Sequence, residues 1–237
     1  HYREGLGRLK KSEFLSYKTA TGLVNEIVNC VVEDDNQNIF IGTNEGLSIW
    51  NSANKITNFT VKNGLSGGRI RDFSLGEDKV WIATYGGLSY YQNGKIQAFE
   101  ENAKLENHRL RAVFYDRKTK NLWIGSSQGL HCYTAEKEML IYGNKELGNN
   151  NIMLIKSTSK GIAIGTNGGG LVFYQDGIFR VMRTEEGLSG NVIFDVYEDK
   201  QNNIWVATNA GLTLIRDEKI NVFRAKNGFN SNVIFQT

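Results

Sequence analysis

Four arginines are spaced so that they could form one anion-binding site. Arg69 and Arg71 stand at the start of one hydrophobic segment, and Arg109 and Arg111 hold the same places 40 residues later (109 − 69 = 40 and 111 − 71 = 40). A guanidinium group presents its N–H donors as a fork that matches a carboxylate or a sulfate. If the two segments are neighbours in space, the four side chains predict a basic patch that recognises an acidic sugar. The alternative is that they are solvated arginines balancing nearby acids.

Four further residues complete the candidate ligand-binding set. Tyr85 follows the hydrophobic run of "KVWIATYGGLSYY", where its ring could stack on a sugar or could simply pack the loop. His108 directly precedes Arg109, although one histidine in a loop is more often a surface residue than a ligand. Asn151 and Asn191 are the last two candidates.

Two segments have weaker claims to ligand chemistry. "TNGGGL" at residues 166–171 could cradle an anion with backbone N–H groups, but a flexible turn explains it better. "DDNQN" at residues 34–38 resembles half of a calcium loop and lacks the required spacing and closing Glu. We expect no metal site and no cofactor.

Residues that would carry catalysis are scarce. The chain has three histidines and contains neither a Gly-x-Ser-x-Gly elbow nor a phosphate loop. Asp72 and Asp195 are the only candidates for the carboxylate pair of a glycosidase. The other acids fall mostly in turns that we expect on the face of the fold opposite the candidate ligand-binding loops. We expect this chain not to be an enzyme.

Composition narrows the classes of partner. The chain has 237 residues, 40% apolar content and a net charge of only +3, which does not argue for nucleic acid or an anionic membrane. It contains no run of eighteen apolar residues, so we expect no membrane contact by this segment. Cys30 and Cys132 match no metal spacing and are predicted to be buried apolar side chains.

The elements that position these residues come from an internal repeat. Gly-Leu pairs begin at Gly46, Gly87, Gly129, Gly170 and Gly211, with spacings of 41, 42, 41 and 41. In one copy we predict strands at residues 69–75, 80–84, 88–91 and 95–99, joined by turn clusters. A period in the low forties with four strands per unit is typical of a β-propeller blade. We therefore predict an all-β fold, a β-propeller of four-stranded blades with five to six blades in this chain.

The second strand of each copy explains how blades would stack. In "NIFIGT", "KVWIAT" and their counterparts both faces are apolar, as expected for a strand sandwiched between neighbours. A small residue then leaves room for the adjoining sheet, and a hydroxyl residue can satisfy backbone donors. In a propeller the loops joining second to third strand, and fourth to next first strand, share one face. Tyr85 and the arginines would lie there.

The motif "NIWVATNAGL", together with the short recurring motif "GLS-N" and an acidic "EDK-N" turn, resembles the two-component regulator propeller repeat. The resemblance spans nearly the whole chain, although Ser66 and Ser189 stand where family repeats often carry Pro. It implies the sensor region of a bacterial hybrid histidine kinase or related receptor, in a ring that commonly has seven blades. Residues 1–237 would then be one propeller domain or a portion of one, in the N-terminal part of a longer receptor.

The resemblance implies a non-catalytic sensor on the periplasmic or extracellular side of the bacterial inner membrane. It would bind an oligosaccharide or other small molecule and signal through downstream domains of the same protein to a kinase; a homodimer is left open. The alternatives are a propeller scaffold that binds protein partners, and a propeller glycoside hydrolase or lyase.

Overall fold

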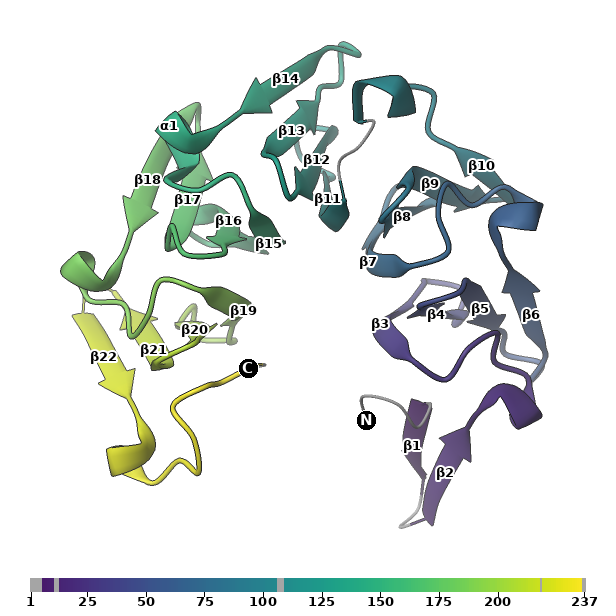
Figure 1. The fold of residues 1–237 in the computed structure, drawn as a ribbon, viewed down its shortest axis with the longest axis horizontal. Helices are drawn as coiled ribbons and strands as arrows, with labels where there is room; N and C mark the ends of the chain where they lie inside the picture. Colours follow the sequence, from purple (N-terminus) through teal and green to yellow (C-terminus); the bar gives the residue numbers. More distant parts are fainter. Residues whose placement is uncertain (1–5, 11–12, 106–108, 218, 236–237) are drawn as a thin grey trace. The chain divides into compact units, whose positions relative to one another are not determined.

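The computed structural model describes residues 6–10, 13–105, 109–217 and 219–235, and nearly all of its regular structure is β-strand (Figure 1). A first hairpin consists of β1 (Leu6–Lys10) and β2 (Glu13–Tyr17). Five sets of four strands follow. The first two sets are β3 (Val28–Glu33), β4 (Ile39–Thr43), β5 (Leu47–Trp50), β6 (Ile56–Phe59), β7 (Ile70–Leu75), β8 (Val80–Thr84), β9 (Gly87–Gln92) and β10 (Lys95–Ala98). The other three are β11 (Leu110–Asp116), β12 (Asn121–Ser126), β13 (Leu130–Tyr133), β14 (Met139–Tyr142), β15 (Ile152–Thr158), β16 (Gly161–Thr166), β17 (Leu171–Gln175), β18 (Ile178–Met182), β19 (Ile193–Glu198), β20 (Ile204–Thr208), β21 (Gly211–Arg216) and β22 (Lys219–Phe223).

Short helical turns connect one set of strands to the next. They are η1 (Thr19–Thr21), η2 (Val61–Asn63), η3 (Asn102–Leu105), α1 (Asn144–Leu147), η4 (Thr184–Glu186) and η5 (Ala225–Asn227). The Gly of the "TGL", "NGL", "EGL" and "NGF" motifs ends four of them. Gly64, for example, has φ of 104°, a left-handed conformation that glycine adopts without steric penalty, and its N–H bonds to Val61 O.

The chain divides into two compact units, residues 1–117 and 118–237, and each is described by itself. Within each unit the four-stranded sheets are antiparallel and follow chain order, as in β3-β4-β5-β6 and β19-β20-β21-β22. Strand β11 belongs to the first unit and β12–β14 to the second. The prediction of a β-propeller built from four-stranded blades is confirmed.

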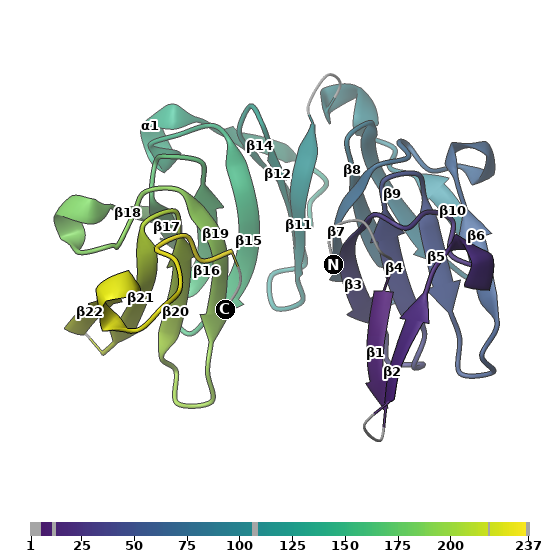
Figure 2. The ribbon, with the colours of Figure 1, turned by 60° about the horizontal axis from the view of Figure 1, so that its bottom comes forward.

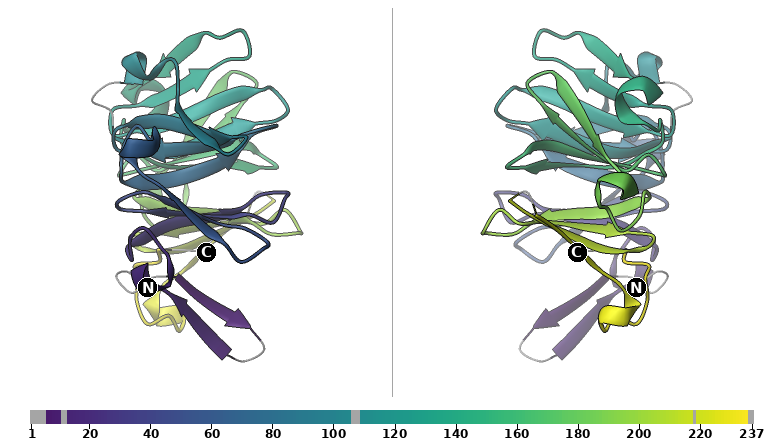
Figure 3. Two further views of the ribbon diagram at one scale, coloured as in Figure 1. Left: turned by 90° about the vertical axis from the view of Figure 1, so that its right-hand side faces the viewer. Right: turned by 90° about the vertical axis from the view of Figure 1, so that its left-hand side faces the viewer.

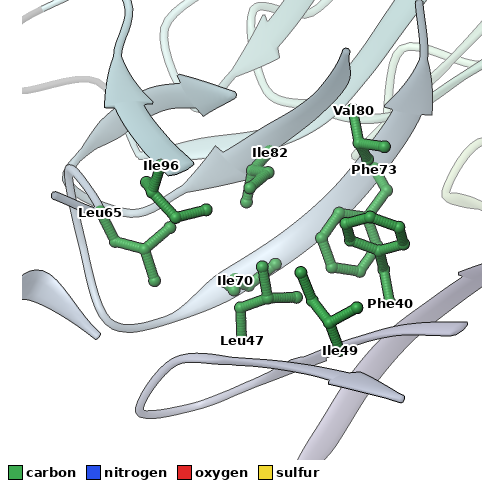
Figure 4. Close-up of a cluster of buried hydrophobic side chains, with 9 residues drawn as sticks. All are labelled: Phe40, Leu47, Ile49, Leu65, Ile70, Phe73, Val80, Ile82 and Ile96. Carbon is green, nitrogen blue, oxygen red and sulfur yellow. The ribbon is translucent and has the colours of Figure 1, made fainter. Parts of the chain in front are cut away.

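In the first unit the sheets β3–β6 and β7–β10 pack face to face (Figure 4). The side chains between them come from both sheets, and Phe40 and Phe73 meet edge to face with ring centroids 6.2 Å apart. Each fully buried side chain of this size stabilises the fold by about 1.5–3 kcal/mol. The first hairpin lies beside the sheet β3–β6 (Figure 2). On that face Ile41 and Trp50 pack with Leu6 and Tyr17 of the hairpin. Strand β4 is therefore apolar on both faces, as its sequence predicts.

The small residue in each second strand makes room for a neighbouring sheet. A Cβ atom on Gly42 would lie 2.6 Å from Ile70 Cγ2 and 2.5 Å from Cys30 Sγ. The next residue, Thr43, donates its hydroxyl to Gly46 O (2.8 Å) and accepts from Gly46 N (3.2 Å). Thr84, Ser126, Thr166 and Thr208 repeat the donated bond in the other copies.

The second unit repeats this packing between β15–β18 and β19–β22 (Figure 3). Ile193, Val196 and Val206 are at most 2% exposed there, and Leu171 and Ala163 from the other sheet are fully buried. Among the described residues no helix is long and apolar enough to cross a bilayer, and no cluster of three His, Cys, Asp or Glu side chains could hold a metal.

Candidate functional site

Tyr85 lies immediately after β8, in the turn that leads to β9. The turn is fixed by Thr84, whose Oγ1 donates to Gly87 O (2.7 Å) and accepts from Gly86 N (3.1 Å). The backbone N–H of Tyr85 bonds to Arg69 O (3.1 Å), which ties this turn to the start of β7. The ring is half-buried, so one part packs against protein and another part is open to solvent.

Three arginines surround the Tyr85 ring. Their Cζ atoms lie 5.3 Å (Arg69), 5.6 Å (Arg71) and 5.8 Å (Arg109) from the ring centroid, which is the range of a cation–π contact. Arg69 and Arg109 each stand just before a first strand. Arg71 stands at a β-bulge between Ile70 and Asp72, and such a bulge re-aims the side chain it carries.

Among the described residues, no carboxylate forms an ion pair with Arg69, Arg71 or Arg109. The Nε atom of Arg71 is buried and has no hydrogen-bond partner. The Nε of Arg69 donates to Asn44 Oδ1 (2.9 Å), which also accepts from Asn29 Nδ2 (3.0 Å). Three guanidinium groups therefore surround one aromatic ring, and Asn44, held in turn by Asn29, positions the side chain of Arg69.

Asn29 and Asn44 were not among the sequence candidates, although the repeat register could have found them. Asn44 follows β4 as Tyr85 follows β8. Asn29 stands at the same bulge in β3 that Arg71 occupies in β7, and its amide also donates to Ile70 O (2.9 Å). The sheet β3–β6 thus supplies the neutral amides of Asn29 and Asn44 at the positions where the sheet β7–β10 supplies Arg71 and Tyr85.

The other sequence candidates are Arg111, His108, Asn151 and Asn191. Arg111 is half-buried in β11, two residues after Arg109. His108 lies outside the described residues. Asn151 and Asn191 both brace residues 166–170 of the second unit: Asn151 O accepts from Asn167 N (2.9 Å), and Asn191 O accepts from Gly168 N (3.1 Å) and Gly170 N (3.0 Å).

The glycine-rich loop of the second unit has little left with which to cradle an anion. Besides the bonds to Asn151 and Asn191, Gly169 N donates to Thr166 Oγ1 (2.9 Å). These amides are therefore occupied, which favours the interpretation of "TNGGGL" as a turn. In "DDNQN", Asp34 Oδ1 accepts from the backbone amides of Asn36 (3.0 Å) and Asn38 (2.8 Å), which makes it a turn-forming residue.

The two carboxylates considered for catalysis support the backbone. Asp72 accepts from Phe73 N (2.9 Å) and from Val113 N (3.0 Å), linking β7 to β11. Asp195 accepts from Val196 N (2.9 Å) and lies 3.7 Å from Lys156 Nζ. Cys132 is buried, as predicted, whereas Cys30 is half-buried, and the two do not form a disulfide with each other. Burial raises the pKa of the Cys30 thiol well above its ordinary value, and the Asp72 carboxylate raises it further.

Solved structures with the same architecture establish the class of protein. The extracellular domain of a putative hybrid two-component system from B. thetaiotaomicron superposes with a TM-score of 0.82 and 24% identity, over 97% of this chain and 33% of that one. The extracellular domain of a putative one-component system from the same organism gives 0.58 and 19%, over 81% and 33%. Virginiamycin B lyase from Staphylococcus aureus, in a catalytically inactive form with quinupristin, gives 0.64 and 12%, over 83% and 69%. The chain is a β-propeller protein, and it spans about a third of the length of the two receptor structures.

One repeat of the chain matches a known family model. Residues 187–210, which contain "GLSGN" and "EDKQNNIWVATNA", match the family described as two component regulator propeller. The match covers this copy of the repeat, and the other sets of four strands follow the same order of elements. No curated protein matches the chain.

Proposed function

We propose that this chain is a ligand-sensing propeller of a bacterial two-component receptor and that it binds an acidic oligosaccharide at Tyr85. The observation that carries the proposal is the convergence of Arg69, Arg71 and Arg109 on one half-buried ring, with no described carboxylate paired to them. Like charges held together repel, so an anion would relieve that repulsion as well as form charge-assisted hydrogen bonds.

The geometry favours a sugar that carries a carboxylate or sulfate over a simple ion. The guanidinium groups can bind the anionic substituent, and the Tyr85 ring and the amide of Asn44 offer stacking and hydrogen bonding to the rest of a pyranose. Arg111 and His108, which lie in the same unit, remain candidates for further contacts with this ligand. Asn151 and Asn191 remain candidates for ligand contacts within the second unit. The site needs no chemical step, which is consistent with a non-catalytic role.

The receptor context rests on the comparisons. The repeat family is named for two-component regulators, and two similar structures are extracellular domains of one- and two-component systems. We infer that this chain lies on the periplasmic or extracellular side of the inner membrane, as one domain or part of one in the sensor portion of a longer receptor. Binding would be transmitted through further domains, or through a homodimer, to a downstream kinase.

Two other functions remain as competitors. A protein-binding scaffold would use the same face without a small ligand. The hypothesis of a hydrolase or lyase is supported by the fold shared with virginiamycin B lyase, but an identity of 12% shows the fold alone. The backbone hydrogen bonds of Asp72 and Asp195 argue against their acting as a catalytic pair.

Calorimetric titration with matched pairs of sulfated and neutral oligosaccharides tests the ligand. We expect the sulfated member of at least one pair to bind, and Arg71→Ala and Arg109→Ala to weaken it about tenfold or more, because a hydrogen bond to a charged group contributes about 1.5–3 kcal/mol. Lys62→Ala removes the same charge from an exposed position of the same unit and should leave the affinity unchanged.

Two results would contradict the proposal. One is equal binding of charged and neutral sugars, and the other is wild-type affinity in both Arg71→Ala and Arg109→Ala. A thermal-shift screen that finds no ligand, combined with capture of a protein partner, would favour the scaffold. Turnover of a sugar that is lost in Asp72→Asn or Asp195→Asn would favour the enzyme. The receptor context is tested separately by the full-length gene, which should encode a membrane span followed by kinase motifs.

A further inference from the structure

The outer part of the space between neighbouring sheets is filled by aromatic rings in two places. In the first unit, Tyr91 of β9 lies edge to face against Phe40 (5.3 Å) and Phe59 (5.8 Å) of the preceding sheet. In the second unit, Tyr174 of β17 lies 4.7 Å from Trp123, which in turn stacks at 6.1 Å on Tyr142. At least three rings therefore close each of these interfaces.

Strand register shows which residues hold these positions between β15–β18 and β19–β22. An apolar residue near the start of each second strand pairs with the position of Tyr91 and Tyr174. The pairs are Val80 with Tyr91, Ile162 with Tyr174, and Ile204 with Ile215. By the same register, Ala163 holds the position of Phe40 and Trp123, and Met182 holds that of Phe59 and Tyr142. All three rings are absent from this interface.

The missing rings leave a cavity of about 600 Å³ in the second unit. Its inner wall consists of Phe173, Met182, Ile215 and Ile220. Phe173 of β17 pairs directly with Ala163 of β16. Its ring therefore fills part of the space that the small Ala163 side chain leaves, but not all of it. Ile178, with 58% of its surface exposed, also lines the cavity.

The cavity has an apolar floor and a charged rim, which is the usual construction of a small-molecule site. Lys160 and Arg180 lie on the rim together with Asp176 and Asp217, and Lys160 Nζ is already bonded to Asp217 O (2.9 Å). The rim charges cancel, so the cavity has no net preference for an anion or a cation. Selectivity would come from the floor, which presents apolar side chains and one ring.

We propose that this cavity binds a small uncharged aromatic molecule. Its ring takes the place that Tyr91 and Tyr174 fill in the other interfaces, with its edge or face against Phe173. A polar substituent would point to the rim. This site belongs to the second unit and is independent of the arginines around Tyr85, so either proposal can fail alone.

Methyl NMR of the whole chain, with indole as the probe, tests the site. We expect saturable shifts of the Ile215, Ile220 and Met182 methyl signals. Ile215→Tyr restores the side chain of the other copies, so it should fill the cavity, weaken indole binding about tenfold or more and raise the melting temperature. Ile141→Tyr makes the same change at a position with 66% of its surface exposed and should do neither.

The outcomes separate clearly. Saturable shifts that persist unchanged in Ile215→Tyr would overturn the assignment, as would a wild-type protein whose methyl signals do not respond to indole. If Ile215→Tyr does not fold, Met182→Phe provides the second variant, because Phe59 holds that position in another copy; it too should block the probe. Indole binding in both filled variants would again overturn the proposal.

Discussion

Tyr85 combines two features that are separate elsewhere in the molecule. The residues at the same position in other copies are short and polar: Asn44, Ser127, Asn167 and Asn209. Only at Tyr85, among the described copies, does an aromatic ring at this position lie next to arginines from two successive first strands. A ring at this position is not required for the turn, because asparagine and serine form the same turn. Its position beside three cations that no described carboxylate pairs with is why we propose ligand contact there.

Replacing Tyr85 by Asn or by Phe separates the roles of the ring and the hydroxyl. Tyr85→Asn removes the cation–π contacts, each about 0.5–1 kcal/mol at an exposed site, and should weaken acidic-sugar binding by about tenfold. Tyr85→Phe keeps the ring and should bind almost as the wild type. Calorimetric titration measures both. Equal loss in the two variants would instead assign the binding energy to the hydroxyl.

Asp199 has a structural role that depends on its charge. Its carboxylate accepts from Asn203 Nδ2 (2.8 Å) and from the backbone amides of Gln201 and Asn203, and Trp205 Nε1 donates to it at 3.2 Å. The side-chain amide of Asn203 is the largest cause of a pKa lowered from 3.8 to about 2. Because the folded pKa is depressed, its stabilisation is present above the unfolded pKa and is lost as pH falls through the folded one.

We therefore expect the stability difference between wild type and Asp199→Ala to be constant near neutral pH and to shrink between pH 3.8 and about 2. Urea unfolding at a series of pH values measures it, and carboxyl NMR gives the pKa directly. Asp217→Ala, at an exposed carboxylate of the same unit, is the control. A difference that grows on acidification would contradict the assigned sign.

At the scale of the strand, the small residue at Gly42 is set by the neighbouring sheet. Ala83 and Ala207 show that a methyl group fits in other copies, whereas a Cβ on Gly42 would overlap Ile70 and Cys30. Gly42→Ala should destabilise the fold by about 1–3 kcal/mol, the usual cost of overpacking a buried position. Gly68→Ala is the matched control, because its nearest neighbours are 3.7 Å away. Thermal unfolding of the two variants should therefore diverge; equal melting temperatures would show that the sheets separate easily.

The strands were predictable from the sequence, but several of the links between them were not. The strands predicted at 69–75, 80–84, 88–91 and 95–99 are observed at Ile70–Leu75, Val80–Thr84, Gly87–Gln92 and Lys95–Ala98, because alternation and turn residues act locally. The short helix η2 before Gly64 shows no helical periodicity, since three residues cannot display one.

The candidate site shows the same limit. Repeat spacing was enough to group Arg69, Arg71 and Arg109, because equivalent positions of neighbouring blades lie close together. It could not reveal that Asn44 holds the Arg69 side chain, since that contact depends on side-chain orientation. Nor could it show that the glycine-loop amides bond to Asn151 and Asn191, which requires the three-dimensional path of the backbone.

At the scale of the whole molecule, each unit consists of strands whose contacts run mainly to the same sheet or to the next one along the chain. Asn29 bonds to Ile70 O, Asp72 to Val113 N and Ser74 to Tyr115 N, each with a sequence separation of 41 residues. Each of the two units also has its own buried cluster of apolar side chains. Such nearest-neighbour architecture resembles that of repeat proteins, in which a local change in stability stays largely local.

Gly165→Ala tests whether the effects of mutations stay local in this way. A Cβ there would lie 2.8 Å from Leu154 Cγ and 2.9 Å from Ile193 Cγ2, so it should loosen the interface between β15–β18 and β19–β22. Amide hydrogen exchange should therefore speed up in those strands, while β3–β10 keep wild-type protection. The Gly42→Ala variant is the reciprocal control, with faster exchange expected in β3–β10. If both variants accelerate exchange uniformly along the chain, the propeller opens as a single cooperative structure, and nearest-neighbour packing does not govern its stability.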